Sequence, residues 1–486
     1  MSHSSADRIS AAEEICVPIE ACPSPVFVTR EGSQFPLLAS ALAAQMGPPR
    51  SEDSSLRSHL SYQGYGLGKT LVEGIFETPL GYRTTFKDGD VSFSVAEEAQ
   101  DLSKVDAELA VAEIRARTKR SVARCIEGAK HIGVLTSGGM DSSWLACIAA
   151  KLKSRGTKLT LIASYFEDVG DDRPYFHTLI DWTEANAVKM LPRDAGRYVE
   201  ESMVRDAQPS MWIAAANIPV VMNVVEREGI DVLLHGTPGD TLFDGDSRYT
   251  NYAWRMRRYG DALRWSATYR SIYLRSRWIA VKRLLLRPLI VPKLKKIRAV
   301  RSLLAQRRAL PRWFGEKLRV ADSSTEEEQT NYDLSPTQRL LAVGDVSNGL
   351  DSWARHEYRK RGVRVMSPYS DHDLASFVAG LDPLLLSYGN EYRGLYRRVL
   401  EGEVPPSIAK RQSKSYFERE HEEIFRGADL ASLLGYARPE ALARAGWVEH
   451  DPYLHACTNA LRSGQGWMQF YPYLCVEKWM REWGIQ

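Results

Sequence analysis

Long apolar runs, closely paired cysteines and a secretion signal are all missing from this chain of 486 residues. Its six cysteines are scattered and form no CxxC pair, which argues against a disulfide scaffold or a cysteine-rich zinc site and favours the reducing cytoplasm. The N-terminus lacks the basic and apolar regions of a signal peptide. The apolar stretch over 279–292 is short and interrupted by cations, so it does not predict a membrane-spanning helix.

The composition is instead that of a globular protein. Hydrophobic residues make up 44% of the chain and charged residues 26%, which is enough apolar material for large cores. A chain of this length is expected to form two or three domains. We place the main boundary near residue 110.

The charge is distributed unevenly along the chain. The segment over 254–319 contains 20 lysines and arginines but only two acids, a net charge of +18, and the other 420 residues carry −15. Aromatic residues are interleaved with these arginines, which is compatible with amphipathic helices that bury an aromatic stripe. It is equally compatible with a docking surface for an acidic peptide, a partner protein or a membrane face. No nucleic-acid-binding motif accompanies the charge, so nucleic acid is not an expected partner.

The order of the predicted elements indicates an α/β fold. Alternating apolar and polar residues over 70–96 predict short antiparallel strands, and the spacing over 105–129 predicts a helix. Three apolar runs predict buried strands at 131–136, 158–166 and 230–236. Helices are predicted after the first two strands, at 144–154 and 172–188. Such alternation predicts a parallel sheet covered on both faces. A polar, acidic loop is expected over 321–336, and helices over most of the remaining chain.

The strongest motif lies between the first predicted strand and the helix that follows it. It reads Ser137, Gly138, Gly139, Met140, Asp141, Ser142. The glycines allow close approach of the backbone to an anion, and the N–H groups at a helix start point toward it. Because a carboxylate would repel phosphate, Asp141 implies Mg²⁺ as well as a nucleotide.

A second motif follows the third predicted strand. Gly236 and Gly239 lead to Asp240 in the sequence HGTPGDTLF. Loops at the carboxyl ends of parallel strands form the ligand crevice of such sheets. Asp240 is therefore expected to reach the same Mg²⁺ as Asp141.

Together the two motifs resemble those of the asparagine synthetase family of ATP pyrophosphatases. The resemblance implies a parallel-sheet PP-loop synthetase domain with extra helices over 111–486, including a basic helical insertion at 254–320. A truncated, β-rich region similar to an amidotransferase domain would precede it over 1–110. The segments 367–383 and 404–417 resemble two later family elements.

This resemblance also implies roles for individual residues. Lys414 would face the α-phosphate of ATP and the departing pyrophosphate, as a compact cation can. The phosphate cradle would comprise Ser137, Gly138, Gly139, Asp141 and Ser142, with Asp141 and Asp240 as magnesium ligands. Leu135, Phe166 and Gly236 would line the adenosine pocket.

The sequence departs from glutamine-dependent members of that family. They begin Met-Cys, whereas this chain begins Met-Ser-His and its first cysteine is Cys16, so ammonia from glutamine is not expected. Thr237 stands where asparagine synthetases carry a glutamate base, and Thr241 replaces the glutamate after the second aspartate. The adenylating residues are therefore present without the residues that handle ammonia.

An adenylating enzyme without an ammonia source needs another amine. The elements at 310–319, 411–417 and 474–483 resemble those of lasso peptide cyclases, which join an Asp or Glu side chain of a precursor peptide to its N-terminal amine. This resemblance implies a precursor peptide, a leader peptidase and a leader-binding protein as partners, and leaves association with a membrane or transporter open. The basic segment would then clamp the peptide. The residue that deprotonates the amine is not identified.

Three other functions are compatible with parts of the sequence to different degrees. A small-molecule or sugar amide ligase, similar to β-lactam synthetase or to an ammonia-dependent asparagine synthetase, would need no peptide. RNA thiolation requires catalytic cysteines near the loop, but Cys147 is expected to face the core of the following helix. A non-catalytic scaffold would have little reason to keep Asp141, Asp240 and Lys414, because buried carboxylates are costly without a counter-ion.

Overall fold

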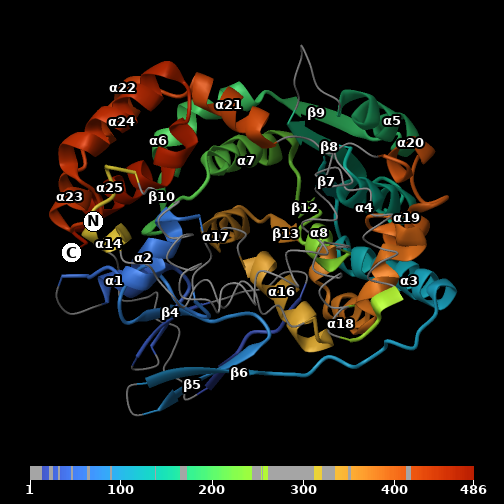
Figure 1. Cartoon of the computed structure of the whole chain (residues 1–486). Coiled ribbons are helices and arrows are strands. Elements are labelled where there is room, and N and C mark those ends of the chain that lie inside the picture. The colour runs from blue at the N-terminus through green and yellow to red at the C-terminus, as the bar shows by residue number, and fades with distance from the viewer. Residues whose placement is uncertain are drawn as a thin grey trace.

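A computed structural model gives the fold (Figure 1). The residues that it describes are 14–20, 26–30, 33–44, 48–62, 66–87, 90–136, 138–164, 172–243, 253, 256–260, 311–319, 334–348, 352–411 and 417–485. Most of the basic segment and nearly all of the acidic 321–336 loop thus lie outside the described residues. Within the basic segment, the short helix α14 (Glu316–Arg319) is described.

A five-stranded parallel sheet forms the centre of the fold. Its order is β13-β12-β7-β8-β9, and every neighbouring pair runs parallel. Three strands confirm those predicted from apolar runs, namely β7 (His131–Leu135), β8 (Lys158–Ser164) and β12 (Val232–Leu234). Two edge strands were not predicted, β9 (Asn186–Met190) and β13 (Arg364–Met366).

The prediction of a helix over 172–188 was wrong in its last part. Helix α5 (Arg173–Thr183) ends at Glu184, whose φ of 51° is left-handed, and β9 begins two residues later. An edge strand that is mostly exposed lacks the continuous apolar run of a central strand, so its sequence carries little strand signal.

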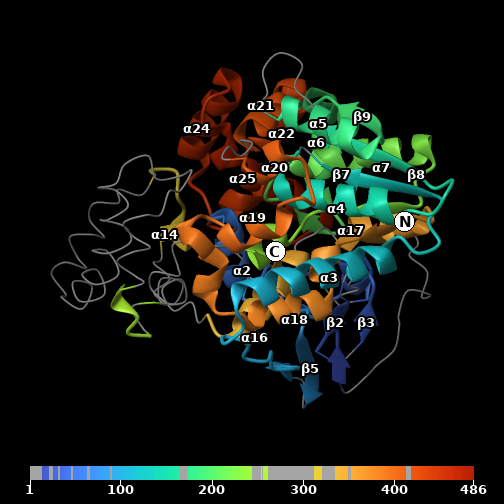
Figure 2. The same ribbon diagram turned by 90° about the vertical axis from the view of Figure 1, so that its right-hand side faces the viewer.

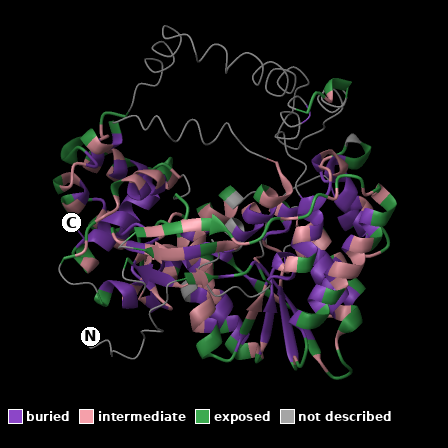
Figure 3. Cartoon of the chain, turned by 90° about the horizontal axis from the view of Figure 1, so that it is seen from below, coloured by how far each residue is buried: buried purple, intermediate pink, exposed green. Residues whose placement is uncertain are grey.

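Helices cover both faces of the sheet. Alternate strand residues point to opposite faces, so Val232 and Leu234 join one core while Leu233 joins another. The first core includes residues of α3 (Ala107–Cys125), α4 (Met140–Leu152) and α18 (His372–Gly380), and the second includes residues of α7 (Asn217–Glu228). Figure 3 shows the strands as a buried fan, and Figure 2 shows α3 and α18 side by side. The prediction of an α/β fold with a parallel sheet covered on both faces is confirmed.

The strand order fixes where a ligand crevice can form. From β7 the chain extends the sheet in one direction through β8 and β9, and later returns to add β12 and β13 on the other side. The carboxyl ends of β7 and β12 therefore flank the switch point, where open α/β sheets bind ligands. Both sequence motifs begin at these two strand ends.

The region before residue 110 is rich in antiparallel strands, as predicted. It contains two three-stranded sheets, of order β1-β5-β6 and β3-β2-β4. Their strands are β1 (Glu14–Cys16), β2 (Phe27–Thr29), β3 (Gln34–Phe35), β4 (Ile75–Glu77), β5 (Tyr82–Lys87) and β6 (Asp90–Val95). Its similarity to an amidotransferase domain stays a prediction.

The N-terminal region also packs against the C-terminal helices. Helix α2 (Asp53–Leu60) contacts α25 (Tyr471–Trp483), and apolar side chains of both join one core (Figure 1). The predicted helical character of the last part of the chain is confirmed by α21 (Phe417–Gly427), α22 (Leu430–Tyr436), α24 (His450–Ser463) and α25.

Candidate functional site

The loop after β7 is shaped by Gly138. Its φ of 80° is left-handed, and a Cβ there would lie 2.7 Å from the Cβ of Tyr175. The N–H of Gly138 and the hydroxyl of Ser142 both donate to Oγ1 of Thr136, at 3.1 and 2.9 Å. Gly139 then caps α4, so the first N–H groups of that helix face the loop. This backbone can cradle a phosphate.

The two predicted magnesium ligands lie together at the neighbouring strand ends. Asp141 is in the first turn of α4, and Asp240 is in the short helix α8 (Gly239–Leu242) after β12. Nη1 of Arg393 lies 3.0 Å from Oδ2 of Asp141 and 3.0 Å from Oδ1 of Asp240. One guanidinium nitrogen therefore bonds both carboxylates.

Glycines of the second motif permit this convergence. A Cβ at Gly236 would lie 3.2 Å from the Cβ of Asp141, and a Cβ at Gly239 would lie 2.8 Å from its Oδ1. The loop that begins at Gly236 is thus packed directly on Asp141. The position of Gly236 beside the end of β7, where Leu135 is half-buried, is compatible with the predicted adenosine pocket.

Arg393 is the principal residue that the sequence analysis missed. It precedes α19 (Gly394–Leu400), has a left-handed φ of 56°, and is 2% exposed. Its Nη2 also pairs with Asp141, and its guanidinium lies 4.5 Å from the ring centroid of Tyr396. The partners are 252 residues apart along the chain, so no local pattern indicated the pair.

Burial and ion pairing have opposite effects in this cluster. Burial raises the pKa of Asp141, and the adjacent Arg393 reduces that rise without cancelling it. Burial alone would lower the pKa of Arg393, but the charge of Asp141 raises it well above its usual value. Arg393 therefore keeps its positive charge between the two carboxyl groups.

Tyrosine hydroxyls fix the start of α4 from the other side. The hydroxyl of Tyr369 donates to the carbonyl of Asp141 at 2.8 Å and lies 3.0 Å from the hydroxyl of Tyr396. Burial raises the pKa of both phenols well above the usual value, so they stay neutral. Tyr369 belongs to the segment after β13 that resembles a family element, and Asp371 caps the following α18.

The predicted lysine segment is anchored on both sides. Before it, Arg411 donates to the carbonyl of Gly138 at 2.9 Å and pairs with Asp172. After it, Glu420 accepts from the hydroxyl of Ser164, the last residue of β8, at 2.7 Å, and from Asn217 at 2.9 Å. The described residues on either side of 412–416 therefore contact the ends of β7 and β8. Lys414, together with Ser137 and Phe166, lies outside the described residues.

The predicted core position of Cys147 is confirmed. Cys147 is 1% exposed, and burial raises the pKa of its thiol to about 12, so it is a core residue rather than a nucleophile. His235 is buried, and burial lowers the pKa of its imidazole to about 3, so it also has a core role.

The described ranges contain neither a ready-made metal cluster nor a membrane-spanning helix. No cluster there contains three or more His, Cys, Asp or Glu side chains arranged for a metal ion. None of the helices in the same ranges is long and apolar enough to cross a bilayer. Two carboxylates converging on one cation do fit Mg²⁺, which prefers oxygen ligands and often binds through one or two carboxylates plus substrate phosphates.

Comparison with known proteins adds three findings. A family model described as asparagine synthase matches residues 113–481. Asparagine synthetase 3 (glutamine-hydrolyzing) of Bacillus subtilis (strain 168) is 22% identical over 431 residues, which are 83% of this chain but 64% of that relative's length. A solved structure of the U34-tRNA thiolase NcsA from Methanococcus maripaludis with its 4Fe–4S cluster is similar at a TM-score of 0.27 and 11% identity, covering 78% of this chain and 80% of that chain.

Proposed function

The chain belongs to the asparagine synthase family, and we propose that it is an ATP-dependent ligase that adenylates a carboxylate and transfers the acyl group to an amine. The observation that carries this proposal is the convergence of Asp141 and Asp240 beside the glycine loop at the switch point of the sheet. A phosphate cradle and a pair of carboxylates in one crevice suit a magnesium nucleotide.

The proposed reaction has two steps. A carboxylate oxygen of the substrate attacks the α-phosphorus of ATP, pyrophosphate leaves, and an acyl-adenylate forms. The amine then attacks the acyl carbon, loses a proton, and expels AMP. Adenylation is needed because oxide is a poor leaving group whereas AMP is a good one.

Residues of this chain would hold the reactants. The N–H groups around Gly138 and Gly139 would bind pyrophosphate, and Asp141 and Asp240 would hold Mg²⁺, which when bound neutralises phosphate charge. Lys414 would approach the same phosphates; this is supported by Arg411, which contacts Gly138, and by Glu420, which contacts Ser164. Holding the amine beside the adenylate can lower the barrier by roughly 7–11 kcal/mol.

For the substrate we propose a precursor peptide, cyclised through an Asp or Glu side chain and its own N-terminal amine into a macrolactam of the lasso type. The support is the resemblance of 310–319, 411–417 and 474–483 to lasso cyclases, together with Thr237 in place of a glutamate base. The carbonyl of Thr237 accepts a hydrogen bond from the hydroxyl of Ser367. The side-chain hydroxyl of Thr237 is not basic, unlike a glutamate carboxylate. A leader peptidase and a leader-binding protein would complete the pathway.

A small-molecule amide ligase is the second candidate. It is favoured by the 22% identity to a glutamine-hydrolyzing asparagine synthetase, which by its name makes a small amino acid. The scaffold alternative is disfavoured because Asp141, which is largely buried, and the exposed Asp240 are both kept at the switch point, where a site without a ligand would be free to lose them.

The products of ATP cleavage test the proposed chemistry. Purified protein would be incubated with Mg-ATP and linear peptides that carry an Asp or Glu, and followed by phosphorus NMR and mass spectrometry. We expect AMP, pyrophosphate and a peptide one water lighter, with ¹⁸O from a labelled side-chain carboxylate recovered in AMP. ADP and phosphate would contradict adenylation, and AMP formation only with small acids would select the small-molecule ligase.

A further inference from the structure

The position of Arg393 raises the question of how a metal could enter the site. Its Nη1 is equidistant, at 3.0 Å, from one oxygen of Asp141 and one of Asp240. Its Nη2 engages the other oxygen of Asp141, so that carboxylate is gripped by both arms of the guanidinium. A cation already occupies the place between the two predicted metal ligands.

Contacts outside the carboxylate pair hold this guanidinium in place. Nη2 also reaches the carbonyl of Gly239 at 3.3 Å, and the guanidinium stacks over Tyr396. The side chain is also only 2% exposed, so these contacts are shielded from solvent. Arg393 is therefore expected to stay beside the carboxylates when a ligand binds.

A metal ion on its own would meet a repulsive site. Mg²⁺ binds carboxylate oxygens at about 2.0–2.1 Å, so an ion that bridged Asp141 and Asp240 would lie in direct contact with the guanidinium. The guanidinium already compensates charge on both carboxylates, and it would repel a second cation placed beside it. Nucleotide phosphates change this balance, because they bring several negative charges that compensate both cations.

We propose that Arg393 makes metal binding depend on nucleotide binding: it serves as the counter-ion of Asp141 and Asp240 in the free protein, and a divalent ion enters only together with the phosphates of ATP. The proposal rests on the proposed function, since it takes the nucleotide to be the ligand of the crevice. Arg393 is thus a positioning residue. It keeps both carboxylates in place when no metal is bound, and it prevents them from binding a metal ion before the nucleotide is present.

Titration with Mn²⁺, followed by electron paramagnetic resonance, tests this on the intact protein. For wild type without nucleotide we expect no site tighter than about 1 mM, and with a non-hydrolysable ATP analogue one site at least 100-fold tighter. Arg393→Met should bind Mn²⁺ alone at least tenfold more tightly than wild type, because the competing charge is gone. Arg393→Lys, which keeps the charge, should resemble wild type.

A matched control separates charge from packing. Arg397 lies one turn later in α19 and is also buried, but donates to the carbonyls of Tyr392, Ala409 and Arg411. Arg397→Met should therefore leave the binding of Mn²⁺ alone unchanged. Thermal melting of each variant shows whether it has folded. If Arg393→Met has not folded, the titrations of wild type and Arg393→Lys decide whether metal binding depends on the nucleotide.

Two results would overturn the proposal. One is a micromolar Mn²⁺ site in wild type that is unaffected by the nucleotide, and the other is equal Mn²⁺ affinity in folded Arg393→Met and wild type. Failure of wild type to bind the ATP analogue at any metal concentration would instead overturn the proposed function. The gain in Arg393→Met is measured without nucleotide, so the two failures are distinguishable.

Discussion

The candidate site has two sides that use buried arginines differently. On the metal side, Arg393 pairs with the carboxylates of Asp141 and Asp240. On the lysine side, Arg397 and Arg411 donate mainly to backbone carbonyls, and each adds one ion pair, Arg397 with Glu391 and Arg411 with Asp172. All three arginines are less than 9% exposed, so the difference lies in their partners and not in burial.

This difference separates ligand binding from scaffolding. Carboxylates paired with a guanidinium keep lone pairs that a metal can share, so the metal side can change its partners when a nucleotide arrives. The backbone carbonyls that accept hydrogen bonds from Arg397 are not expected to bind metal. These hydrogen bonds instead hold the chain in place up to Arg411. Four variants should break or sharpen the contrast, beginning with the largest expected effect.

Asp141→Ala should abolish the function of the metal side. Without this carboxylate the site loses a magnesium ligand and leaves Arg393 partly unpaired, so we expect AMP-forming activity to fall by about 10³-fold or more. Pyrophosphate release is the measurement, and Asp141→Asn, which preserves shape, should lose a comparable amount. Activity within tenfold of wild type in either variant would remove Asp141 from the mechanism.

Arg397→Met should act on the lysine side by lowering the free energy of unfolding. The carbonyls of Ala409 and Arg411 are buried with this arginine, and each unsatisfied acceptor costs about 1–3 kcal/mol. We expect the free energy of unfolding in urea to fall by about 3 kcal/mol. A loss below about 0.5 kcal/mol would show that these bonds do not support the segment.

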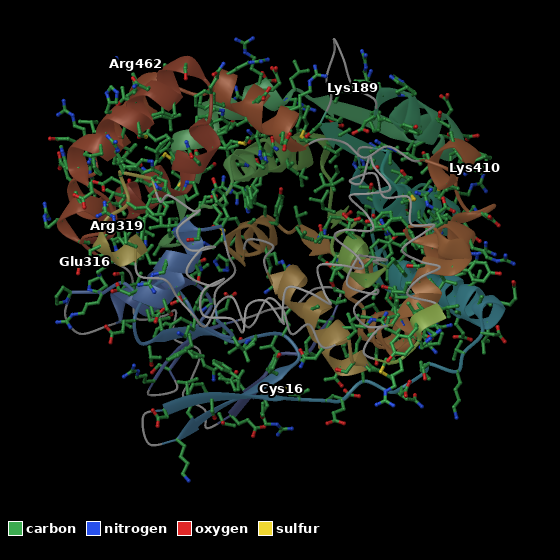
Figure 4. All side chains as sticks on the ribbon, in the orientation of Figure 1. Cys16, Lys189, Glu316, Arg319, Lys410 and Arg462 are labelled. Atoms are coloured by element: carbon green, nitrogen blue, oxygen red, sulfur yellow. The ribbon has the colours of Figure 1, made fainter. Side chains whose placement is uncertain are left out.

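Lys414→Ala should reduce pyrophosphate release by about 10²-fold while the free energy of unfolding stays within about 0.5 kcal/mol of wild type. Lys410→Ala is the matched control, because Lys410 is exposed four residues earlier and its side chain lies on the outside of the molecule (Figure 4). That control should retain full activity. Equal losses in the two variants would assign the effect to general charge and not to Lys414.

Gly138→Ala should weaken nucleotide binding more than its backbone strain alone explains. A left-handed residue other than glycine costs about 1–2 kcal/mol, and the added Cβ would also press on Tyr175. Gly128→Ala isolates the strain, since Gly128 has a φ of 71° but open space around it. Calorimetric ATP titration should show weaker binding for Gly138→Ala alone; an equal change in both variants would contradict a role for loop shape.

The sequence allowed one part of this site to be predicted and hid another. Strands β7, β8 and β12 were predictable because strands buried on both faces are continuous apolar runs, and their order placed Asp141 and Asp240 at neighbouring ends. The short, exposed β9 and β13 lacked that signal. Arg393, Arg397 and Arg411 were missed because their functions arise from partners far away in the sequence or from backbone carbonyls, which no residue pattern encodes.

The most direct test of the central claim is intact mass spectrometry of peptides from cells that express this chain with its flanking genes, run in parallel for wild type and Asp141→Ala. We predict a peptide one water lighter than its linear core, present only with wild type and resistant to carboxypeptidase. A cyclised peptide that forms equally with Asp141→Ala, or no peptide of altered mass while a small acid yields AMP and pyrophosphate, would contradict the account of a peptide cyclase.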